Sequence, residues 1–529
     1  MGLQDASFSF TCSRCDLRYN INVDGDVSQT GQTQTPILSA LQASAQRSQA
    51  AFYAPGHKRG QGASSQLRDL LGKETLQADL PELPELDNLF APEGVILEAQ
   101  TLAAEAFGAE QTYFLANGST CGLEAATLAT CGPGDKIIVP RNVHRSVLAG
   151  LVLAGAMPVY VPPDYAPDLG LALGVAPGTI AAALDQYADV RAVLVVSPTY
   201  HGVCSDLGAI ASLVHNHGIP LIVDEAHGPH FAFHPELPTP ALAQGADLVV
   251  QSTHKVLGAL TQASMLHTRG DRIDHARLQA ALQITQSTSP SYLLLASLDA
   301  ARHQMATVGQ VLLGQTLALA QRMRSTLATI PGLEVIDQGH LQGYPSVAAL
   351  DLTRLTVDVS GLGLSGLEAD DILHNQLGVT AELPELRHLT FIVSLGNTPT
   401  DGQRCIDGFR TLAQRQEQRG KEVVPPSSLP AYPAQPITLP SVSPRQAFFA
   451  QSVTVTVAEA VGRLSAETIS AYPPGIPTLV AGEPITAAAL DHLVTTRQQG
   501  GYVTGCSDAS LATLKVLALG KGGCYEQVG

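Results

Sequence analysis

Lys255 follows an apolar stretch that is typical of a buried strand, within the motif Ser252-Thr-His-Lys255. A lysine at a strand end inside a cleft is desolvated, which makes its proton easier to lose and its amine a nucleophile toward an aldehyde. Taken alone, Lys255 is better explained as a surface lysine that happens to follow a strand. Two features upstream change this interpretation.

The first feature is Asp224, which ends the apolar run Ile219-Pro-Leu-Ile-Val-Asp224. A carboxylate there could pair with a protonated pyridine nitrogen, although it could equally cap a helix or form a salt bridge. The second feature is Asn117-Gly-Ser-Thr120, between a predicted strand and helix, where backbone N–H groups and hydroxyls can hold a phosphate. The ordered combination of phosphate cradle, strand-end carboxylate and lysine predicts pyridoxal 5'-phosphate (PLP) held as an aldimine, a Schiff base, on Lys255.

Short apolar strands alternate with helical stretches through this part of the chain. The expected strands cover residues 111–116, 136–140, 158–161, 191–197, 219–224 and 246–251. Continuously apolar strands separated by helices indicate a mainly parallel sheet covered on both faces, and ligands bind beyond the carboxyl ends of such strands. The chemically interesting residues all lie just after a predicted strand, so we expect them to meet at one edge of the sheet.

The domain organisation follows from shifts in composition. Residues 1–35 are polar and are expected to form an N-terminal arm, residues 36–300 a large α/β domain and residues 301–420 a smaller α/β region. A Pro- and Ser-rich stretch, residues 421–440, is expected to be a linker. It leads to a C-terminal domain over residues 441–529.

The motifs resemble those of one known family in the same order. These motifs are Ala54-Pro-Gly-His-Lys58, Asn117-Gly-Ser-Thr120, Arg141-Asn-Val-His144, Ser197-Pro-Thr-Tyr200, Asp224-Glu-Ala-His-Gly228 and Ser252-Thr-His-Lys255. The set is similar to that of the Orn/Lys/Arg decarboxylases, and residues 464–484 resemble the C-terminal domain of that family. Coverage from about residue 35 to 515 implies a fold-type I PLP enzyme (aminotransferase-like), with a mainly parallel sheet in the large domain and a smaller α+β C-terminal domain.

The resemblance also implies individual roles. Lys255 would form the aldimine and Asp224 would pair with the pyridinium nitrogen. His144 would stack on the ring and His227 would lie near the substrate carboxylate. The remaining expected site residues are phosphate ligands or line the site: Ser119, Thr120, Ser252 and His254 in the first group, His57 and Lys58 in the second. Arg145 and Arg59 depart from the family pattern but keep or add positive charge.

The function implied is PLP-dependent decarboxylation of arginine, lysine or ornithine to the corresponding amine and CO₂. The resemblance further implies a homodimer or higher homo-oligomer. Aminotransfer on the same fold, or a catalytically silent homologue that serves as a binding partner, stays open as an alternative. Nothing in the spacing of residues decides which basic amino acid is used.

Composition limits the possible partners. The chain has 529 residues and a formal net charge of −17, which disfavours nucleic acid as a partner. The longest apolar run, about residues 147–163, is interrupted by Gly155 and prolines and is too short to span a membrane. No secretory signal is visible at the start of the sequence, so we expect a soluble, cytoplasmic protein.

Other motifs have simpler explanations. Ser252-x-x-Lys255 matches a motif of penicillin-binding enzymes, but the Lys-Thr-Gly element that they need does not occur. The run Gly361-Leu-Gly-Leu-Ser-Gly366 is better explained as a tight turn that opens a helix than as a dinucleotide site. Cys12 and Cys15, and the close histidine pairs (His215 with His217, His227 with His230), lack the further ligands of a metal site, so no metal is expected.

Overall fold

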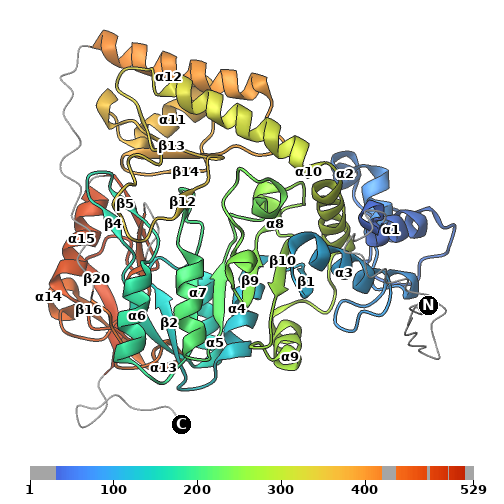
Figure 1. Ribbon diagram of the computed structural model, residues 1–529, viewed down its shortest axis with the longest axis horizontal. Helices are drawn as coiled ribbons and strands as arrows, with labels where there is room; N and C mark the ends of the chain where they lie inside the picture. The colour runs from blue at the N-terminus through green and yellow to red at the C-terminus, as the bar shows by residue number, and fades with distance from the viewer. Residues whose placement is uncertain (1–30, 420–435, 473–476, 499, 519–529) are drawn as a thin grey trace, which may run out of the picture.

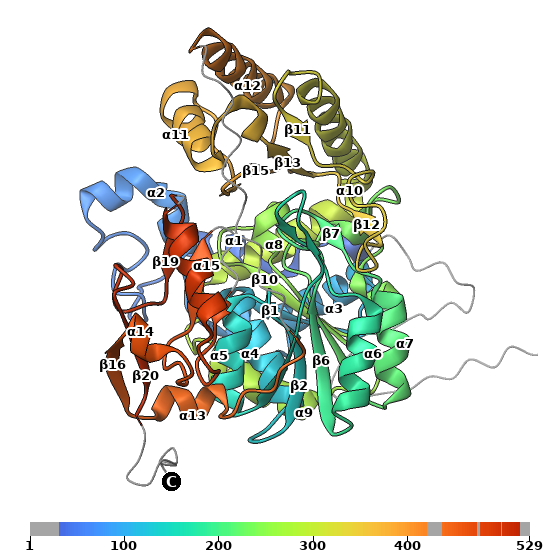
Figure 2. The same cartoon turned by 90° about the vertical axis from the view of Figure 1, so that its left-hand side faces the viewer.

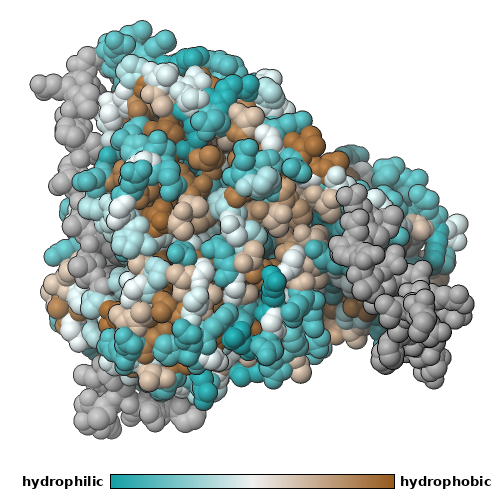
Figure 3. Space-filling model, in the orientation of Figure 1, coloured by the Kyte–Doolittle hydropathy of each residue, from teal (hydrophilic) through white to brown (hydrophobic). Residues whose placement is uncertain are grey.

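The computed structural model describes residues 31–419, 436–472, 477–498 and 500–518. Most of the expected N-terminal arm with Cys12 and Cys15, residues 421–435 of the expected linker and residues 473–476 of the C-terminal motif lie outside the described residues. Within the described residues, no helix combines the length and apolar character that a membrane span needs. Figure 3 shows polar and apolar residues interspersed over the face that it displays.

The large region is built on a seven-stranded sheet (Figure 1). In spatial order its strands are β1 (Gln111–Leu115), β10 (Ser264–Thr268), β9 (Leu248–Gln251), β8 (Leu221–Asp224), β6 (Val190–Val196), β2 (Lys136–Pro140) and β3 (Met157–Val161). The strand β10 pairs antiparallel with both β1 and β9, while the pairs from β9 to β3 are all parallel. The predicted mainly parallel α/β fold is confirmed, and β10 is a strand that the sequence analysis missed.

Both faces of this sheet are covered, because its strands are apolar on both sides. Along β2, Ile137 and Val139 join one core and Ile138 joins another, and all three are 0% exposed. The helices of the first core are α4 (Gly118–Thr130), α5 (Arg145–Ala154) and α9 (His275–Thr285). The helices of the second core are α6 (Pro177–Gln186) and α7 (Leu207–Asn216), and Figure 2 shows the sheet between these layers.

The small region follows a 36-residue helix, α10 (Tyr292–Leu327), which runs across the predicted domain boundary at residue 300. Its sheet contains, in order, β11 (Glu334–Val335), β13 (Arg354–Asp358), β15 (His388–Ile392) and β14 (Leu383–Pro384). The outer face of this sheet packs against α10, α11 (Gly366–Leu377) and α12 (Pro399–Arg419). Gly366 opens α11 and Ser365 caps it, so Gly361–Gly366 is the helix-opening turn that was expected.

The inner face of the small sheet carries polar side chains instead of apolar ones. Alternate residues of β13 and β15 are directed toward the large region and at most 2% exposed: Arg354, Thr356, Asp358, His388 and Thr390. Two short strands, β7 (Val203–Cys204) and β12 (Ala349–Leu350), pair across the junction of the two regions. The small region is therefore joined to the large one through buried polar groups close to the carboxyl end of the large sheet. A two-stranded hairpin, β4 (Tyr165–Ala166) with β5 (Leu171–Ala172), packs into the same small core as Val203 of β7 and Leu350 of β12.

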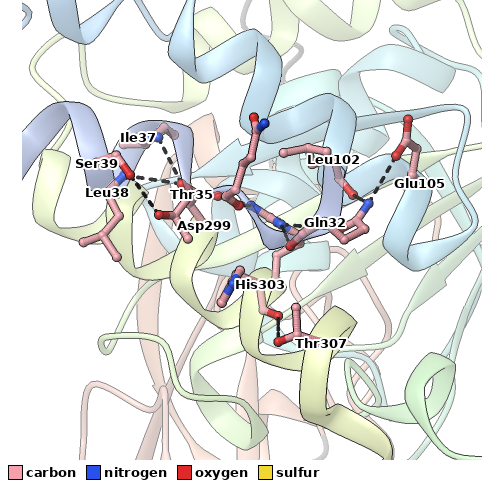
Figure 4. A network of polar contacts seen from close by, with 12 residues as sticks. Gln32, Thr35, Ile37, Leu38, Ser39, Leu102, Glu105, Asp299, His303 and Thr307 are labelled. Atoms are coloured by element: carbon pink, nitrogen blue, oxygen red, sulfur yellow. Dashed lines mark hydrogen bonds and ion pairs between the residues drawn. The ribbon is translucent and has the colours of Figure 1, made fainter. Parts of the chain in front are cut away.

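Three helices, α1 (Pro36–Gln46), α2 (Ser65–Ala78) and α3 (Val95–Phe107), precede the large sheet. Asp299 of α10 accepts hydrogen bonds from the first backbone N–H groups of α1, at Ile37 (3.0 Å) and Leu38 (3.3 Å) (Figure 4). It also forms a buried ion pair of 2.5 Å with Arg302, whose guanidinium donates to the carbonyl of Gln32. One carboxylate thus anchors the N-terminal helix to α10.

Replacement of Asp299 by Ala is expected to lower the free energy of unfolding by about 3–5 kcal/mol, because it leaves the buried Arg302 without its counter-ion. Thermal unfolding followed by circular dichroism would measure the change. Asp185→Ala, at an exposed position of α6, is the control and should change stability by no more than about 0.5 kcal/mol. Equal melting temperatures for the two variants would contradict this account.

The C-terminal region packs beside α5 and the edge of the large sheet. Its helices are α13 (Pro444–Phe449), α14 (Val457–Ala460) and α15 (Ala487–Gln498). Its strands are β16 (Ser452–Thr456), β20 (Thr513–Leu517), β17 (Ile469–Tyr472), β18 (Pro477–Leu479) and β19 (Tyr502–Thr504). A buried, two-pronged ion pair links the regions: Arg141, just after β2, donates to Glu483 at 2.5 and 3.0 Å, and Thr438 also accepts from Arg141 at 3.0 Å.

Candidate active site

The expected site residues lie where strands of the large sheet end and helices begin. Asn117 and Gly118 join β1 to α4, and His144 is the N-cap of α5 after β2. Asp224 is the last residue of β8, and Ser252 follows β9 and opens the short helix α8 (Thr253–Val256), which carries Lys255. Because β1, β2, β8 and β9 run in the same direction, these residues gather at one edge of the sheet.

The N-terminus of α4 is the place where the sequence predicts a phosphate cradle. Gly118 has a φ of 77°, a left-handed conformation that favours glycine. The Ser252 hydroxyl, on a fully buried residue, donates to the Ser119 hydroxyl at 2.8 Å, which joins the ends of β1 and β9. The Asn117 side chain does not cap α4, and Thr120 is exposed in its first turn, so the helix N-terminus presents N–H and hydroxyl groups to an anion.

His254 borders this cradle from α8. Its Nδ1 lies 3.0 Å from the carbonyl oxygen of Ala263, and its backbone N–H donates to the same oxygen at 3.1 Å. Because a carbonyl oxygen can only accept, Nδ1 carries the proton. The ring of His254 is therefore held in one orientation beside Ser252.

Lys255 is half-buried and makes two close contacts. Its Nζ lies 2.9 Å from Nε2 of His227 and 5.5 Å from the centre of the Tyr200 ring. Burial lowers the pKa of the Lys255 amine, and the negative charges of Asp224 and Glu382 oppose that shift. A lysine with a lowered pKa is a better nucleophile at neutral pH than an exposed one.

Asp224 is 3% exposed, and burial raises the pKa of its carboxyl group, while the nearby charges of Lys255 and His144 lower it. One carboxylate oxygen, Oδ1, accepts the backbone N–H of Ala226 at 3.2 Å. In the part of the chain that the structure describes, Oδ2 has no hydrogen bond. A cation placed beside this oxygen would favour the ionised carboxylate.

His144 caps α5 through its own ring. Its Nδ1 accepts the backbone N–H of Ser146 at 3.3 Å and lies 2.8 Å from the hydroxyl of the same serine. The remaining surface of the ring is exposed, so a planar group could stack on it. The charge of His144 also acts on Asp224, which places the two side chains on the same side of the site.

Three residues near Lys255 were not predicted as site residues: Tyr200, Arg354 and Glu382. Tyr200, the last residue of the motif Ser197-Pro-Thr-Tyr200, stacks at an angle on His227, with ring centres 4.5 Å apart. Arg354 donates from Nη2 to the carbonyl oxygen of His227 at 2.9 Å, and the charge of Glu382 acts on Lys255. Both come from the small region, and no sequence spacing connects them to Lys255.

His57 and Lys58 are not brought to the Lys255 group in this chain. His57 pairs with Asp79 at 3.0 Å, and the amine of Lys58 donates to the carbonyl of Tyr53, so both bond within the N-terminal segment.

Two members of the close histidine pairs in the sequence form ion pairs or hydrogen bonds with buried carboxyl groups. His215 pairs with Asp247 at 2.8 Å, and the fully buried His230 pairs with Asp351 at 3.1 Å.

A buried acid–base cluster lies between the small sheet and the loop that carries Tyr200. Nε2 of His201 lies 3.5 Å from Glu385, and Nδ1 of His388 lies 3.9 Å from the same carboxyl group. Burial raises the pKa of Glu385 to about 8. Burial also lowers the pKa of His201 to about 3 and that of His388 to about 4. All three groups are therefore neutral at pH 7.

These shifts predict a stability that falls as the pH rises above about 6.5. The folded histidines bind a proton less readily than the unfolded ones, so their contribution to stability falls as the pH drops from about 6.5 to about 4, while the contribution of the buried carboxyl groups rises over most of the same range. The folded Glu385 keeps a proton that the unfolded chain releases, so stability also falls as the pH rises toward 8, by about 1.4 kcal/mol per pH unit. Glu225, with a pKa of about 8, adds a similar alkaline loss.

Glu385→Gln is expected to remove about half of the alkaline loss, because glutamine does not titrate and Glu225 remains. Melting temperatures between pH 6.5 and 8.5 would measure this. A variant whose melting temperature declines as steeply as that of the wild type would contradict the assignment to Glu385.

Comparison with protein families assigns most of the chain. Residues 35–344 match the family model "Orn/Lys/Arg decarboxylase, major domain" and residues 432–505 match "Orn/Lys/Arg decarboxylase, C-terminal domain". The first match extends past the predicted boundary at residue 300 and past the end of α10.

Similar proteins agree with this assignment. An arginine decarboxylase of Bacillus subtilis is 37% identical over 92% of this chain and 98% of that protein. An arginine decarboxylase of Halalkalibacterium halodurans is 39% identical over the same shares. The fold is similar to that of a lysine decarboxylase of Francisella novicida, with a TM-score of 0.79 and 23% identity over 92% of this chain and 82% of that one.

Proposed function

Since this chain belongs to the Orn/Lys/Arg decarboxylase family and is a decarboxylase, we propose that it converts arginine to agmatine and CO₂ with PLP bound at Lys255. The proposal depends most on one observation: the Lys255 amine is desolvated between His227 and Asp224, beside a helix N-terminus suited to a phosphate. Arginine is preferred among the basic amino acids because of the 37–39% identity to arginine decarboxylases over nearly the whole chain.

The residues present fit PLP. Asp224 is 3% exposed and its Oδ2 makes no hydrogen bond in the described residues, so a protonated pyridine nitrogen is a partner that would pair with it. The uncapped N-terminus of α4, with Ser119, Thr120 and Ser252, would hold the phosphate, and His254 would border it. The exposed ring of His144 would stack on the cofactor.

When bound, PLP supplies an aldehyde that joins amines and a conjugated ring that accepts the electron pair left behind by CO₂. The protein residues provide the rest. Asp224 would keep the ring nitrogen protonated, and Lys255 would provide the amine that anchors the cofactor. Replacing a carboxylate by hydrogen consumes one proton per turnover, and Lys255, whose Nζ lies 2.9 Å from His227, is placed to deliver it. His227 would also lie next to the carboxylate that leaves.

Glu382 is the carboxylate that we propose to bind the cationic end of the substrate. The Glu382 side chain is exposed, and its negative charge raises the pKa values of Lys255, His254 and Arg354. Glu382 therefore lies near the Lys255 amine, on the side of the small region. It also lines a cavity of about 380 Å³ in the small region. A guanidinium or ammonium group would pair with this carboxylate once the α-amine is at Lys255.

A substrate panel tests the proposed function. The PLP-loaded enzyme would be incubated with arginine, lysine, ornithine and, as an acidic control, glutamate, and both CO₂ and the organic product would be measured. Agmatine and CO₂ from arginine in equal amounts are the expected result. A keto acid in place of CO₂ would indicate aminotransfer, and no product from any basic amino acid would indicate a silent homologue; either result would overturn the proposal.

Glu382→Gln is expected to raise KM for arginine by a factor of about two to five, because an ion pair between an exposed carboxylate and the substrate is lost and such a pair is worth up to about 1 kcal/mol. Steady-state kinetics would measure kcat and KM separately. Asp371→Asn, at another exposed carboxylate of the small region, is the matched control and should leave KM unchanged. An unchanged KM in Glu382→Gln would rule out this role.

A further inference from the structure

Arg354 is a fully buried cation behind the Lys255–His227 pair. It is the first residue of β13 and is 0% exposed. Its Nη2 donates to the carbonyl oxygen of His227 at 2.9 Å and lies 3.5 Å from Nδ1 of the same histidine. Its Nε and Nη1 are buried without a hydrogen-bond partner in the described residues. Burying so many unpaired donors is costly, and structural support alone gives no reason for a cation at this place.

The position of Arg354 is set by several independent contacts. The negative charge of Asp351 acts on Arg354, and Asp351 is itself fully buried and held by His230 at 3.1 Å and by the Thr353 hydroxyl at 2.7 Å. The stem of Arg354 packs against Gly202, where an added Cβ would lie 2.8 Å from Cβ of Arg354, so only glycine fits. The guanidinium is therefore held in one place against His227.

The hydrogen-bond donors of Arg354 then determine which ring nitrogen of His227 carries a proton. A guanidinium has donors and no acceptor, so Nδ1 of His227 must be the unprotonated nitrogen that faces it. The proton of the neutral ring is then on Nε2, which lies 2.9 Å from Nζ of Lys255. Nε2–H can only donate, so Nζ accepts through its lone pair, and Lys255 is a free amine.

The electrostatic environment points in the same direction. Burial lowers the pKa of His227 well below its ordinary value, and the charges of Lys255 and Arg354 lower it further, so the imidazolium form is disfavoured. Arg354 also lowers the pKa of Lys255. A neutral histidine beside a neutral amine is the state that both shifts favour.

We propose that Arg354 is a positioning residue: it fixes His227 as the Nε2–H tautomer and thereby keeps Lys255 as a free amine before the cofactor arrives. This inference rests on the proposed function only in assigning Lys255 as the residue that carries PLP. A free Lys255 amine would react with an aldehyde without first losing a proton, and the aldehyde oxygen would leave as water with the two amine protons as the carbon–nitrogen bond forms. Nothing else is consumed.

The test measures the Lys255 amine directly, without turnover. The cofactor-free full-length protein would be acetylated with a trace of acetic anhydride between pH 6 and 11, and the Lys255 peptide would be quantified by mass spectrometry. Wild-type Lys255 should titrate clearly below its ordinary pKa of about 10.4. In Arg354→Gln the apparent pKa should rise by about one unit, so labelling at pH 7.5 should fall about tenfold.

Two further variants separate positioning from folding. Arg354→Lys keeps a cation near His227 and should restore much of the wild-type labelling. Thr356→Val changes a buried residue on the same face of β13 and should leave the titration of Lys255 unchanged. A folded Arg354→Gln protein with wild-type labelling, or an equal shift in Thr356→Val, would overturn the proposal.

A second measurement covers the case in which Arg354→Gln does not fold. Nitrogen-15 NMR of histidine-labelled wild-type protein, with His227→Asn to assign the signal, would report which ring nitrogen of His227 is protonated. A proton on Nε2 supports the proposal, and a proton on Nδ1 refutes it. Both measurements are independent of catalysis, so a failure of the substrate panel would overturn the proposed function and leave this inference standing.

Discussion

Lys255→Ala is expected to abolish decarboxylation, with a loss of at least about 10⁴-fold in CO₂ release from the preferred amino acid. The substitution removes both the nucleophile that anchors the cofactor and the amine placed to deliver a proton, and acid–base assistance alone is commonly worth about 10²–10⁴-fold. Release of labelled CO₂ from carboxyl-labelled substrate measures the effect over this whole range.

Lys255→Arg is the matched control for this experiment, because arginine keeps the positive charge but is not a nucleophile at neutral pH. It should be as inactive as Lys255→Ala, while the melting temperatures of both cofactor-free variants should stay close to that of the wild type. More than a tenth of wild-type turnover in either variant would mean that another amine carries the chemistry.

Asp224→Asn is expected to reduce turnover by roughly 10²–10³-fold, which is the usual effect of removing one group that stabilises charge in a buried active site. Asparagine keeps the size of the side chain and can still accept the N–H of Ala226, which is 3.2 Å from Oδ1. It cannot stabilise a protonated pyridine nitrogen. Turnover should therefore fall much further than PLP affinity, because the phosphate cradle at Ser119, Thr120 and Ser252 is unchanged.

Asp247→Asn provides the comparison for Asp224→Asn. Asp247 is also buried (2% exposed) and pairs with His215 and Arg272, but these lie away from Lys255. This variant should lose stability and keep its kcat at temperatures where it is folded. Steady-state kinetics together with titration by PLP would separate the two outcomes, and similar kcat values for the two variants would refute a special role for Asp224.

The residues at the carboxyl ends of the large sheet could be predicted because parallel strands impose a common edge. Asp224 and Lys255 each follow an apolar run, and that pattern alone was sufficient to bring them together. The strand β10 was missed for the opposite reason: Ser264-Met-Leu-His-Thr268 has polar residues at three of its five positions, although all five are buried. The ring of buried His267 is satisfied by contacts to distant segments, with Thr112 at 2.8 Å and Gln251 at 3.1 Å.

Arg354 and Glu382 could not be predicted as site residues from the sequence. They belong to the small region, and their place beside Lys255 depends on how its sheet docks on the large one. The boundary expected at residue 300 falls inside α10, which continues without interruption from Tyr292 to Leu327. Residues that join a site from a second region depend on how the two regions pack together. Neither the local sequence pattern nor the spacing of residues reveals that packing.

The ion pair between Arg141 and Glu483 also constrains how this sequence can diverge. The two residues are 342 positions apart and bury opposite charges against each other, so loss of either one leaves an uncompensated charge in the interior. Because Arg141 lies three residues before His144, loss of Glu483 would also disturb the backbone that positions His144 in the candidate active site. Related sequences should therefore keep both Arg141 and Glu483 or replace both, so that substitutions at the two positions occur together.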